Sequence, residues 1–168
     1  METSRSSTVR GRDAIAVVTL WAPLVTVVAT WLSWRSALPA DLPRQWGSEG
    51  VSTTWPTALA IVLAAFVCLA SALIATVSLR HVRAPSRRKT FLFTGFAAGL
   101  ASGVWLLSAG STIAAGGTGP DVIGAWPLLL MVLLGYGLIP FVIAHRWVDD
   151  APSPPTVDVV LASTETGA

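Results

Sequence analysis

Charged residues are scarce in this sequence. Only 12% of the 168 residues are Asp, Glu, Lys or Arg, whereas 53% are hydrophobic and the mean hydropathy is +0.66. Soluble domains usually carry about 25% charged residues, so this deficit indicates a single domain that is solvated by a lipid bilayer. The formal net charge of +2 is also too small to indicate a nucleic-acid partner.

Residues that bind metals or carry out catalysis are equally scarce. Cys68 is the only cysteine, so it forms neither an intramolecular disulfide nor a cysteine-based metal site, and we interpret it as a small packing residue. The two histidines, His81 and His145, do not have the spacing of a pair of metal ligands. No catalytic motif is present. We therefore expect no metal, no cofactor and no enzymatic activity.

Charge is wholly absent from four long apolar runs. They cover residues 14–34, 57–79, 91–113 and 122–144, and none contains Asp, Glu, Lys, Arg or His. About 20 apolar helical residues cross the hydrocarbon core of a bilayer, where backbone groups must be hydrogen-bonded within the protein. The runs do not alternate as the strands of a membrane barrel do. The sequence therefore predicts an all-α fold, an integral membrane bundle of four helices.

The positive charges lie mostly on one side of these runs. Of the 11 lysines and arginines, only Arg35 and Arg44 follow the first run or the third. Because basic loops stay in the cytoplasm, we expect both termini there, in a multi-pass protein of the cell (plasma) membrane. The termini are the tail 1–13 and a Pro-rich, disordered tail 146–168, and the basic loop 80–89 is expected to attract anionic lipid. A secretory signal is the alternative for the first run, but an apolar region longer than about 15 residues favours an uncleaved helix.

Small residues recur at steps of four in the second and third runs. The third run carries Gly95, Gly99 and Gly103, a double G-x-x-x-G pattern that is typical of helix packing in membranes. The second run carries a matching series: Ala60, Ala64, Cys68, Ala72 and Thr76. We expect these two faces to contact each other in an antiparallel helical hairpin. The alternative is that the glycine face forms a homo-oligomer. Pro23 and Pro140 predict kinks in the first and fourth runs.

The loop 35–56 is the most informative stretch outside the apolar runs. Its two prolines, Pro39 and Pro43, block a regular helix, and Gly47 and Gly50 permit a positive φ. We expect Leu38, Leu42 and Trp46 to lie on the membrane surface as an interfacial turn. Tryptophans should anchor this side of the bundle, since indole rings favour the headgroup level. They are Trp34, Trp46, Trp55 and Trp126.

Pro39, Pro43, Trp46 and Gly50 give this loop a pattern that resembles the signature of the DUF1648 family of bacterial membrane proteins. In that family the loop follows the first helix and reads Leu-Pro, about three residues, Pro, one residue, His, an aromatic, and then Gly-x-Pro-Asp. Gln45 stands here in place of the His, and Ser52-Thr53 in place of Pro-Asp. If the family His and Asp form a site, this chain has lost it or keeps only the polar role of Gln45. The resemblance implies an uncharacterised membrane protein, and some relatives are immunity proteins that also sense a secreted toxin.

Three classes of function remain. The first is a non-enzymatic protein of immunity or signal-sensing type, with a peptide ligand or another membrane protein as the partner of the external loop. The second is a subunit of a transporter or channel, against which the lack of ionisable residues in all four runs argues. The third is a membrane enzyme, for which the runs supply no acid or base. We favour the first class.

Overall fold

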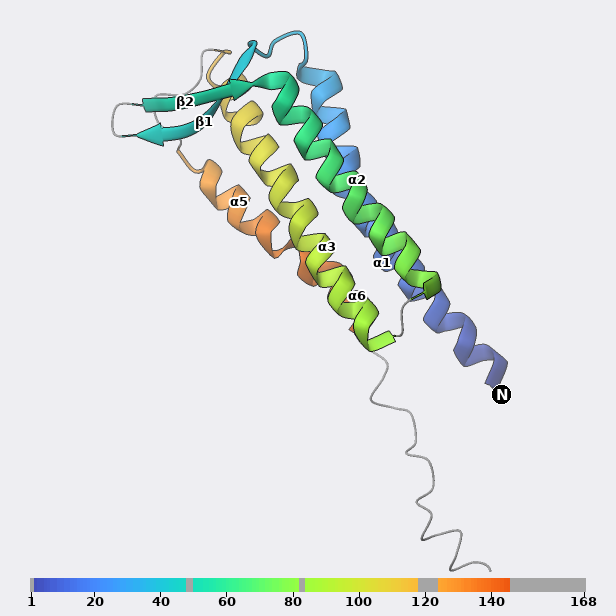
Figure 1. Ribbon diagram of the computed structural model, residues 1–168. Coiled ribbons are helices and arrows are strands. Elements are labelled where there is room, and N and C mark those ends of the chain that lie inside the picture. Colours follow the sequence, from blue (N-terminus) through green and yellow to red (C-terminus); the bar gives the residue numbers. More distant parts are fainter. Residues whose placement is uncertain (1, 48–49, 82–83, 118–123, 146–168) are drawn as a thin grey trace, which may run out of the picture.

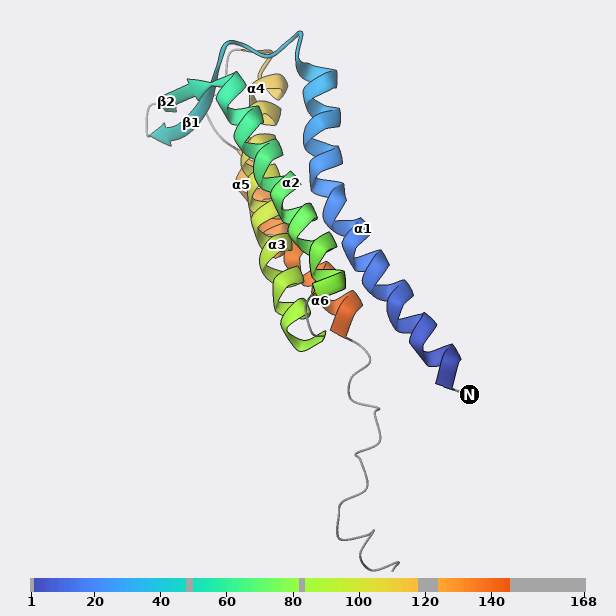
Figure 2. The same ribbon diagram turned by 45° about the vertical axis from the view of Figure 1, so that its right-hand side comes forward.

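The structure, a computed structural model, describes residues 2–47, 50–81, 84–117 and 124–145. Within these residues four helices are long and apolar enough to span a membrane: Gly11–Trp34, Thr57–Arg80, Ser86–Ala114 and Trp126–Ala144. They pack side by side (Figure 1, Figure 2). The chain therefore has the architecture of a multi-pass membrane protein.

The helical elements follow the predicted runs closely. The first two spans are single helices, α1 (Glu2–Trp34) and α2 (Thr57–His81). The third consists of α3 (Ala84–Trp105), a π-helical segment η1 (Leu106–Gly110) and α4 (Ser111–Ala114). The fourth consists of α5 (Trp126–Leu134), a 3-10 segment η2 (Gly135–Gly137) and α6 (Leu138–His145). The tail 146–168 and the first residues of the predicted run 122–144 lie outside the described residues.

The segment 1–13 is helical over its described residues. α1 begins at Glu2 and continues through Gly11, so residues 2–13 and the first span form one helix. The cytoplasmic location of this segment stays a prediction. No proline interrupts this stretch, and a single exposed glycine lowers helix stability by only about 1 kcal/mol. In both views this end of α1 projects beyond the other helices (Figure 1, Figure 2).

The fold is not all-α, because the loop after α1 forms a β-hairpin. Strand β1 (Asp41–Gly47) pairs antiparallel with β2 (Gly50–Pro56), and the register joins Asp41 to Pro56 and Gly47 to Gly50. The predicted interfacial turn is therefore wrong. β-branched and aromatic residues favour strands, and β2 holds Val51, Thr53, Thr54 and Trp55. We call the end of the bundle that carries residues 41–56 the hairpin end.

The second and third spans are antiparallel neighbours, as the sequence predicts. Their contact buries a row of small α2 residues, and the Cys68 thiol donates a hydrogen bond to the Ala98 carbonyl oxygen at 3.5 Å. The row is Ala60, Ala64, Cys68, Ala72 and Ala75. Thr76, which was predicted to belong to it, is exposed. The α-helix has 3.6 residues per turn, so a strict step of four drifts off the contact and Ala75 replaces Thr76.

The predicted partner of the glycine face is wrong. Gly95, Gly99 and Gly103 face the fourth span, not α2: a Cβ at Gly99 would overlap the Leu133 carbonyl oxygen, and one at Gly95 would lie 2.7 Å from the Gly137 Cα. The spacing of small residues identifies a flat face, but it does not identify which neighbour the face accepts. The fourth span supplies a matching surface where Gly137 lies against Gly95. This face is thus covered within the single chain.

The helix is interrupted near only one of the two prolines at which a kink was predicted. α1 continues as one α-helix through Pro23. The fourth span instead changes to a 3-10 turn at Gly135–Gly137, just before Pro140. Pro140 has no N–H for the carbonyl four residues earlier, that of Tyr136, so the break lies where the α-helical hydrogen bond is lost.

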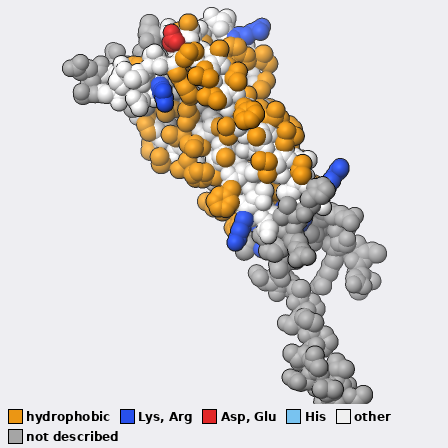
Figure 3. Space-filling view, viewed as in Figure 1, with side chains coloured by type: hydrophobic (Ala, Val, Ile, Leu, Met, Phe, Trp, Pro, Cys, Tyr) orange, Lys and Arg blue, Asp and Glu red, His pale blue; other side chains and the backbone are white. Residues whose placement is uncertain are grey.

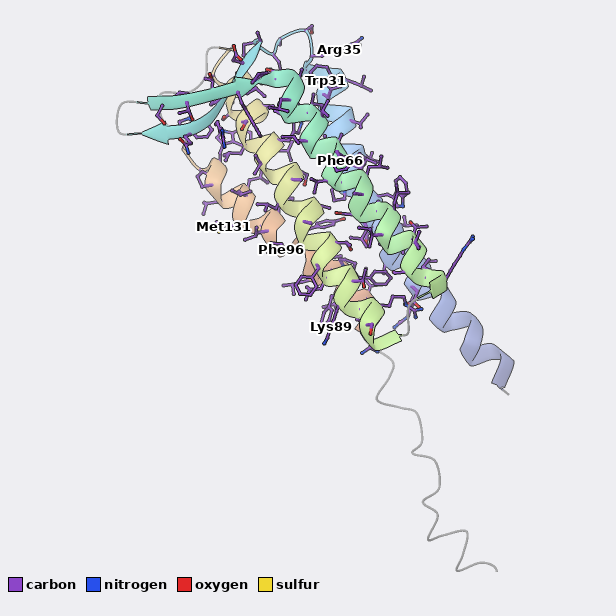
Figure 4. All side chains as sticks on the ribbon, in the orientation of Figure 1. Trp31, Arg35, Phe66, Lys89, Phe96 and Met131 are labelled. Carbon is purple, nitrogen blue, oxygen red and sulfur yellow. The ribbon has the colours of Figure 1, made fainter. Side chains whose placement is uncertain are left out.

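Exposed large apolar side chains occur on all four spans, and they cover much of the face drawn in Figure 3. Phe66, Phe96 and Met131 point away from the helices at mid-height and are 66%, 43% and 61% exposed (Figure 4). Arg35 and Lys89 lie at opposite ends of the bundle (Figure 4). We call the end opposite the hairpin the basic end; its described cations are Arg12, Arg80, Arg87, Arg88 and Lys89.

Candidate functional site at the hairpin end

The hairpin is fixed to the bundle and is not a free loop. Leu42 of β1 is fully buried in a cluster that includes Val27 of α1, Ala60 of α2 and Trp105 of α3. The Thr57 hydroxyl donates to the Pro39 carbonyl oxygen at 2.6 Å, and the Thr57 N–H donates to the Ala40 carbonyl oxygen at 2.8 Å. Leu42 was predicted to lie on the membrane surface. It instead packs into the end of the bundle, where it is fully buried.

The residues of the predicted loop motif are spread over this hairpin. Pro39 is partly buried before β1, Pro43 is buried within β1, and Trp46 is partly buried. Gln45 is exposed, and its side-chain oxygen accepts a hydrogen bond from the Thr53 hydroxyl of β2 at 3.2 Å. Gly50 has φ of 102°, so the expectation of a positive φ is confirmed there. The motif therefore shapes the hairpin, and Gln45 is its solvent-facing member.

The outer surface of the hairpin is mainly polar and carries one charge of each sign among its described residues, Asp41 and Arg44. Its other exposed side chains include Gln45 on β1 and the run 51–54 on β2, of which only Val51 is apolar. The two strands project sideways from the bundle, over the beginning of α5 (Figure 1). A rigid polar projection beyond the ends of the spans can contact molecules in the aqueous phase.

Two buried hydrogen-bond donors in the hairpin have no acceptor. The indole nitrogens of Trp46 and Trp55 are shielded from solvent and have no partner among the described residues. A buried donor without an acceptor costs about 1–3 kcal/mol. Trp55 also packs against the Leu42 cluster, so its ring contributes to the anchoring of the hairpin on the bundle. An acceptor supplied by a ligand or by lipid would remove this cost.

The hairpin rests on the irregular part of the third span. The buried residues Ser108, Ala109 and Gly110 belong to η1, where Ala109 packs in the same cluster as Leu42. A Cβ at Gly110 would meet the Trp126 ring at 2.7 Å, so Trp126 packs against this segment. π-helical segments recur at functional sites. No local sequence signal revealed this one.

Buried polar groups in the spans bond mainly to the backbone. The Ser102 and Thr112 hydroxyls donate to carbonyl oxygens one turn earlier, at 3.1 and 2.8 Å. The Trp105 indole N–H instead donates to the Thr30 hydroxyl oxygen at 2.9 Å, which joins α3 to α1. The Tyr136 hydroxyl donates to the Thr19 carbonyl oxygen at 2.5 Å, which joins the fourth span to the first.

The basic end contains one feature that the sequence did not indicate. Arg87 of α3 forms an ion pair with Asp13 of α1 at 2.6 Å, and the two side chains are only 16% and 14% exposed. The pair is separated by 74 residues in the sequence, and no short-range pattern links them. Among the described residues, no three His, Cys, Asp or Glu side chains form a group able to hold a metal ion.

Comparison with known proteins gives no further assignment. No protein-family model, curated protein or solved structure matches the chain. The fold alone does not define an activity, because four-helix bundles serve many functions. The hairpin and the charged basic end are therefore the features from which a function is argued.

Proposed function

We propose that this chain is a non-enzymatic protein of the cell membrane, of immunity or signal-sensing type, that uses its hairpin to recognise an external ligand. The observation that carries the proposal is the hairpin itself, a polar projection held rigidly by the buried Leu42. A linker between two adjacent spans needs no strands and no buried anchor. The loop pattern Pro39, Pro43, Trp46 and Gly50 supports kinship with the DUF1648 family.

The ligand chemistry that best fits the hairpin is an extended peptide. Val51–Trp55 of β2 carry no charge and no proline, and no backbone hydrogen bond joins them to a described element other than β1. Strands with free backbone groups accept an added strand from a partner. In both views β2 lies on the side of the hairpin that is farther from α5, where a peptide from the aqueous phase has access (Figure 1, Figure 2).

The orientation proposed for the chain places both termini in the cytoplasm and the hairpin outside. The asymmetry of lysine and arginine supports it. Since Cys68 is buried, a single added cysteine gives a clean test. A membrane-impermeant maleimide should label Thr53→Cys on intact cells and Lys89→Cys only after permeabilisation. Labelling of Lys89→Cys alone on intact cells contradicts this orientation.

The recognition role is tested by changing the hairpin surface without its anchor. The variant Arg44→Ala/Gln45→Ala/Thr53→Ala removes three exposed side chains but keeps Leu42 and both prolines. The control Ser36→Ala/Ser86→Ala removes exposed side chains outside the hairpin. Membrane abundance and the phenotype of gene deletion are measured for both. Loss of function by the hairpin variant at normal abundance supports recognition, and full function eliminates it.

A transporter or channel subunit is the second candidate. The breaks at Leu106–Gly110 and Gly135–Gly137 favour it, because interrupted membrane helices often line substrate sites. Against it, the Ser102 and Thr112 hydroxyls at this depth already donate to the backbone. Ion or solute flux into liposomes that hold the purified protein, measured against empty liposomes, separates the two candidates.

A further inference from the structure

The basic end combines charges from three spans. Arg12 belongs to α1, Arg80 to α2, and Arg87, Arg88 and Lys89 to α3. The ion pair between Asp13 and Arg87 shows that the start of the apolar segment of α1 and the first turns of α3 are in direct contact here. Asp13 is the only acidic side chain described at this end, so the positive charge is in large excess.

The position of these cations matches the headgroup layer of a bilayer. The membrane-spanning segments begin at Gly11 and Ser86 and end at Arg80, so each cation lies within a few residues of the end of an apolar span. Arg80 and Lys89 are exposed, and Lys89 extends from the bundle at this level (Figure 4). Lys and Arg side chains at this end lie directly beside apolar surface (Figure 3).

The cations of the basic end differ in whether an acidic side chain neutralises them. The Asp13 carboxylate is 2.6 Å from the Arg87 guanidinium, and both side chains are mostly buried, so Asp13 neutralises the charge of Arg87. Among the described side chains, Arg80 and Lys89 form no ion pair, and both are exposed. A phosphate group at this end therefore meets the exposed cations first, while Asp13 competes with it for Arg87.

We propose that the basic end binds the phosphate headgroup of an anionic phospholipid through Arg80 and Lys89, and that Asp13 limits this binding by neutralising Arg87. Charge complementarity and the headgroup-level position select a lipid, since its acyl chains can lie against the adjoining apolar surface. The inference is independent of the function proposed for the hairpin, which lies at the other end of the bundle.

The test uses the full chain in nanodiscs of phosphatidylcholine, with and without phosphatidylglycerol as a minor component. Native mass spectrometry gives the affinity for phosphatidylglycerol. Each cation near an anionic surface contributes about 1 kcal/mol, so Arg80→Gln/Lys89→Gln should weaken the affinity about 30-fold. The matched control Arg35→Gln/Arg44→Gln removes two exposed arginines at the hairpin end and should leave the affinity unchanged.

Removing the Asp13 carboxylate should change the affinity for phosphatidylglycerol in the opposite direction. Asp13→Asn releases Arg87, so the affinity for phosphatidylglycerol should rise about fivefold, although a buried ion pair has been broken. The double variant Asp13→Asn/Arg87→Gln should leave the affinity nearly unchanged, because it removes a neutral ion pair and keeps the net charge of the basic end. It also tests the inference if Asp13→Asn alone fails to fold. Equal losses in Arg80→Gln/Lys89→Gln and Arg35→Gln/Arg44→Gln, no preference for phosphatidylglycerol, or a marked loss in Asp13→Asn/Arg87→Gln would each overturn the inference.

Discussion

The contact between Gly99 and the fourth span leaves no room for a side chain. A Cβ at Gly99 would overlap the Leu133 carbonyl oxygen and would lie 2.9 Å from the Tyr136 Cβ. Carbon atoms pack favourably at about 3.5–4.0 Å, so in Gly99→Ala the two spans must separate by roughly 1 Å. Backbone atoms on the opposite side cannot rotate away as a flexible side chain can.

The cost of this separation follows from two terms. Overpacking of a close contact costs about 1–3 kcal/mol. The hydrogen bond from Tyr136 to Thr19 is made by the same part of the fourth span, and its loss adds about 1 kcal/mol. We therefore expect Gly99→Ala to lower the free energy of unfolding by about 2–4 kcal/mol. For a chain of this size, that corresponds to a fall in melting temperature of about 10 °C.

Thermal unfolding in detergent, followed by tryptophan fluorescence, measures the effect. The matched control is Gly135→Ala, because a Cβ at Gly135 meets nothing within 4 Å and its φ is not positive. That variant should melt at or slightly above the temperature of the unmodified protein, since alanine favours helix over glycine. Equal melting temperatures for the two variants would refute the account of the glycine face.

Three further predictions concern the other contacts of the bundle. Leu42→Ala should lower the free energy of unfolding by about 2–5 kcal/mol, because it opens a cavity beneath the hairpin, and hydrogen exchange of the β1 and β2 amides should accelerate. Trp105→Phe and Thr30→Val should each lower the free energy of unfolding by about 1 kcal/mol in detergent melts. The double variant should lose less than the sum of the two, because both substitutions remove the same hydrogen bond, and strictly additive losses would contradict this. Gly110→Leu should lower the melting temperature less than Gly99→Leu, because the new side chain at position 110 meets the Trp126 ring, which can rotate away. A larger fall in melting temperature for Gly110→Leu would show that this ring is fixed.

The four spans were predictable because hydropathy is a local property. A run such as 57–79 needs no tertiary contact to be recognised, and the structure places it inside α2. The antiparallel contact of α2 and α3 was predictable for a related reason, since a short connection forces neighbouring helices together. The partner of Gly99 was not predictable, because the flat face of a helix fits any neighbour that is also flat.

The hairpin was missed although its signals are present. Gly47 and Gly50 are separated by two residues, and Val51, Thr53 and Trp55 follow at alternate positions, which is typical of a strand after a tight turn. Pro43 on the first strand obscured this pattern, because proline is unusual within strands. The ion pair of Asp13 and Arg87 had no signal of any kind, because it depends on how α1 and α3 are placed in space.

The limited burial of the fourth span has a consequence for biogenesis. Only 11% of its most apolar window is buried, against 44% for the third span, and no residue of α5 is fully buried. The first three spans share the Leu42 cluster and can assemble on one another before the fourth is made. The fourth span then packs against the glycine face of Gly95, Gly99 and Gly103. A side chain on that face would block this packing, so we expect the variant chain to accumulate as an intermediate whose first three spans are assembled and whose fourth span is not.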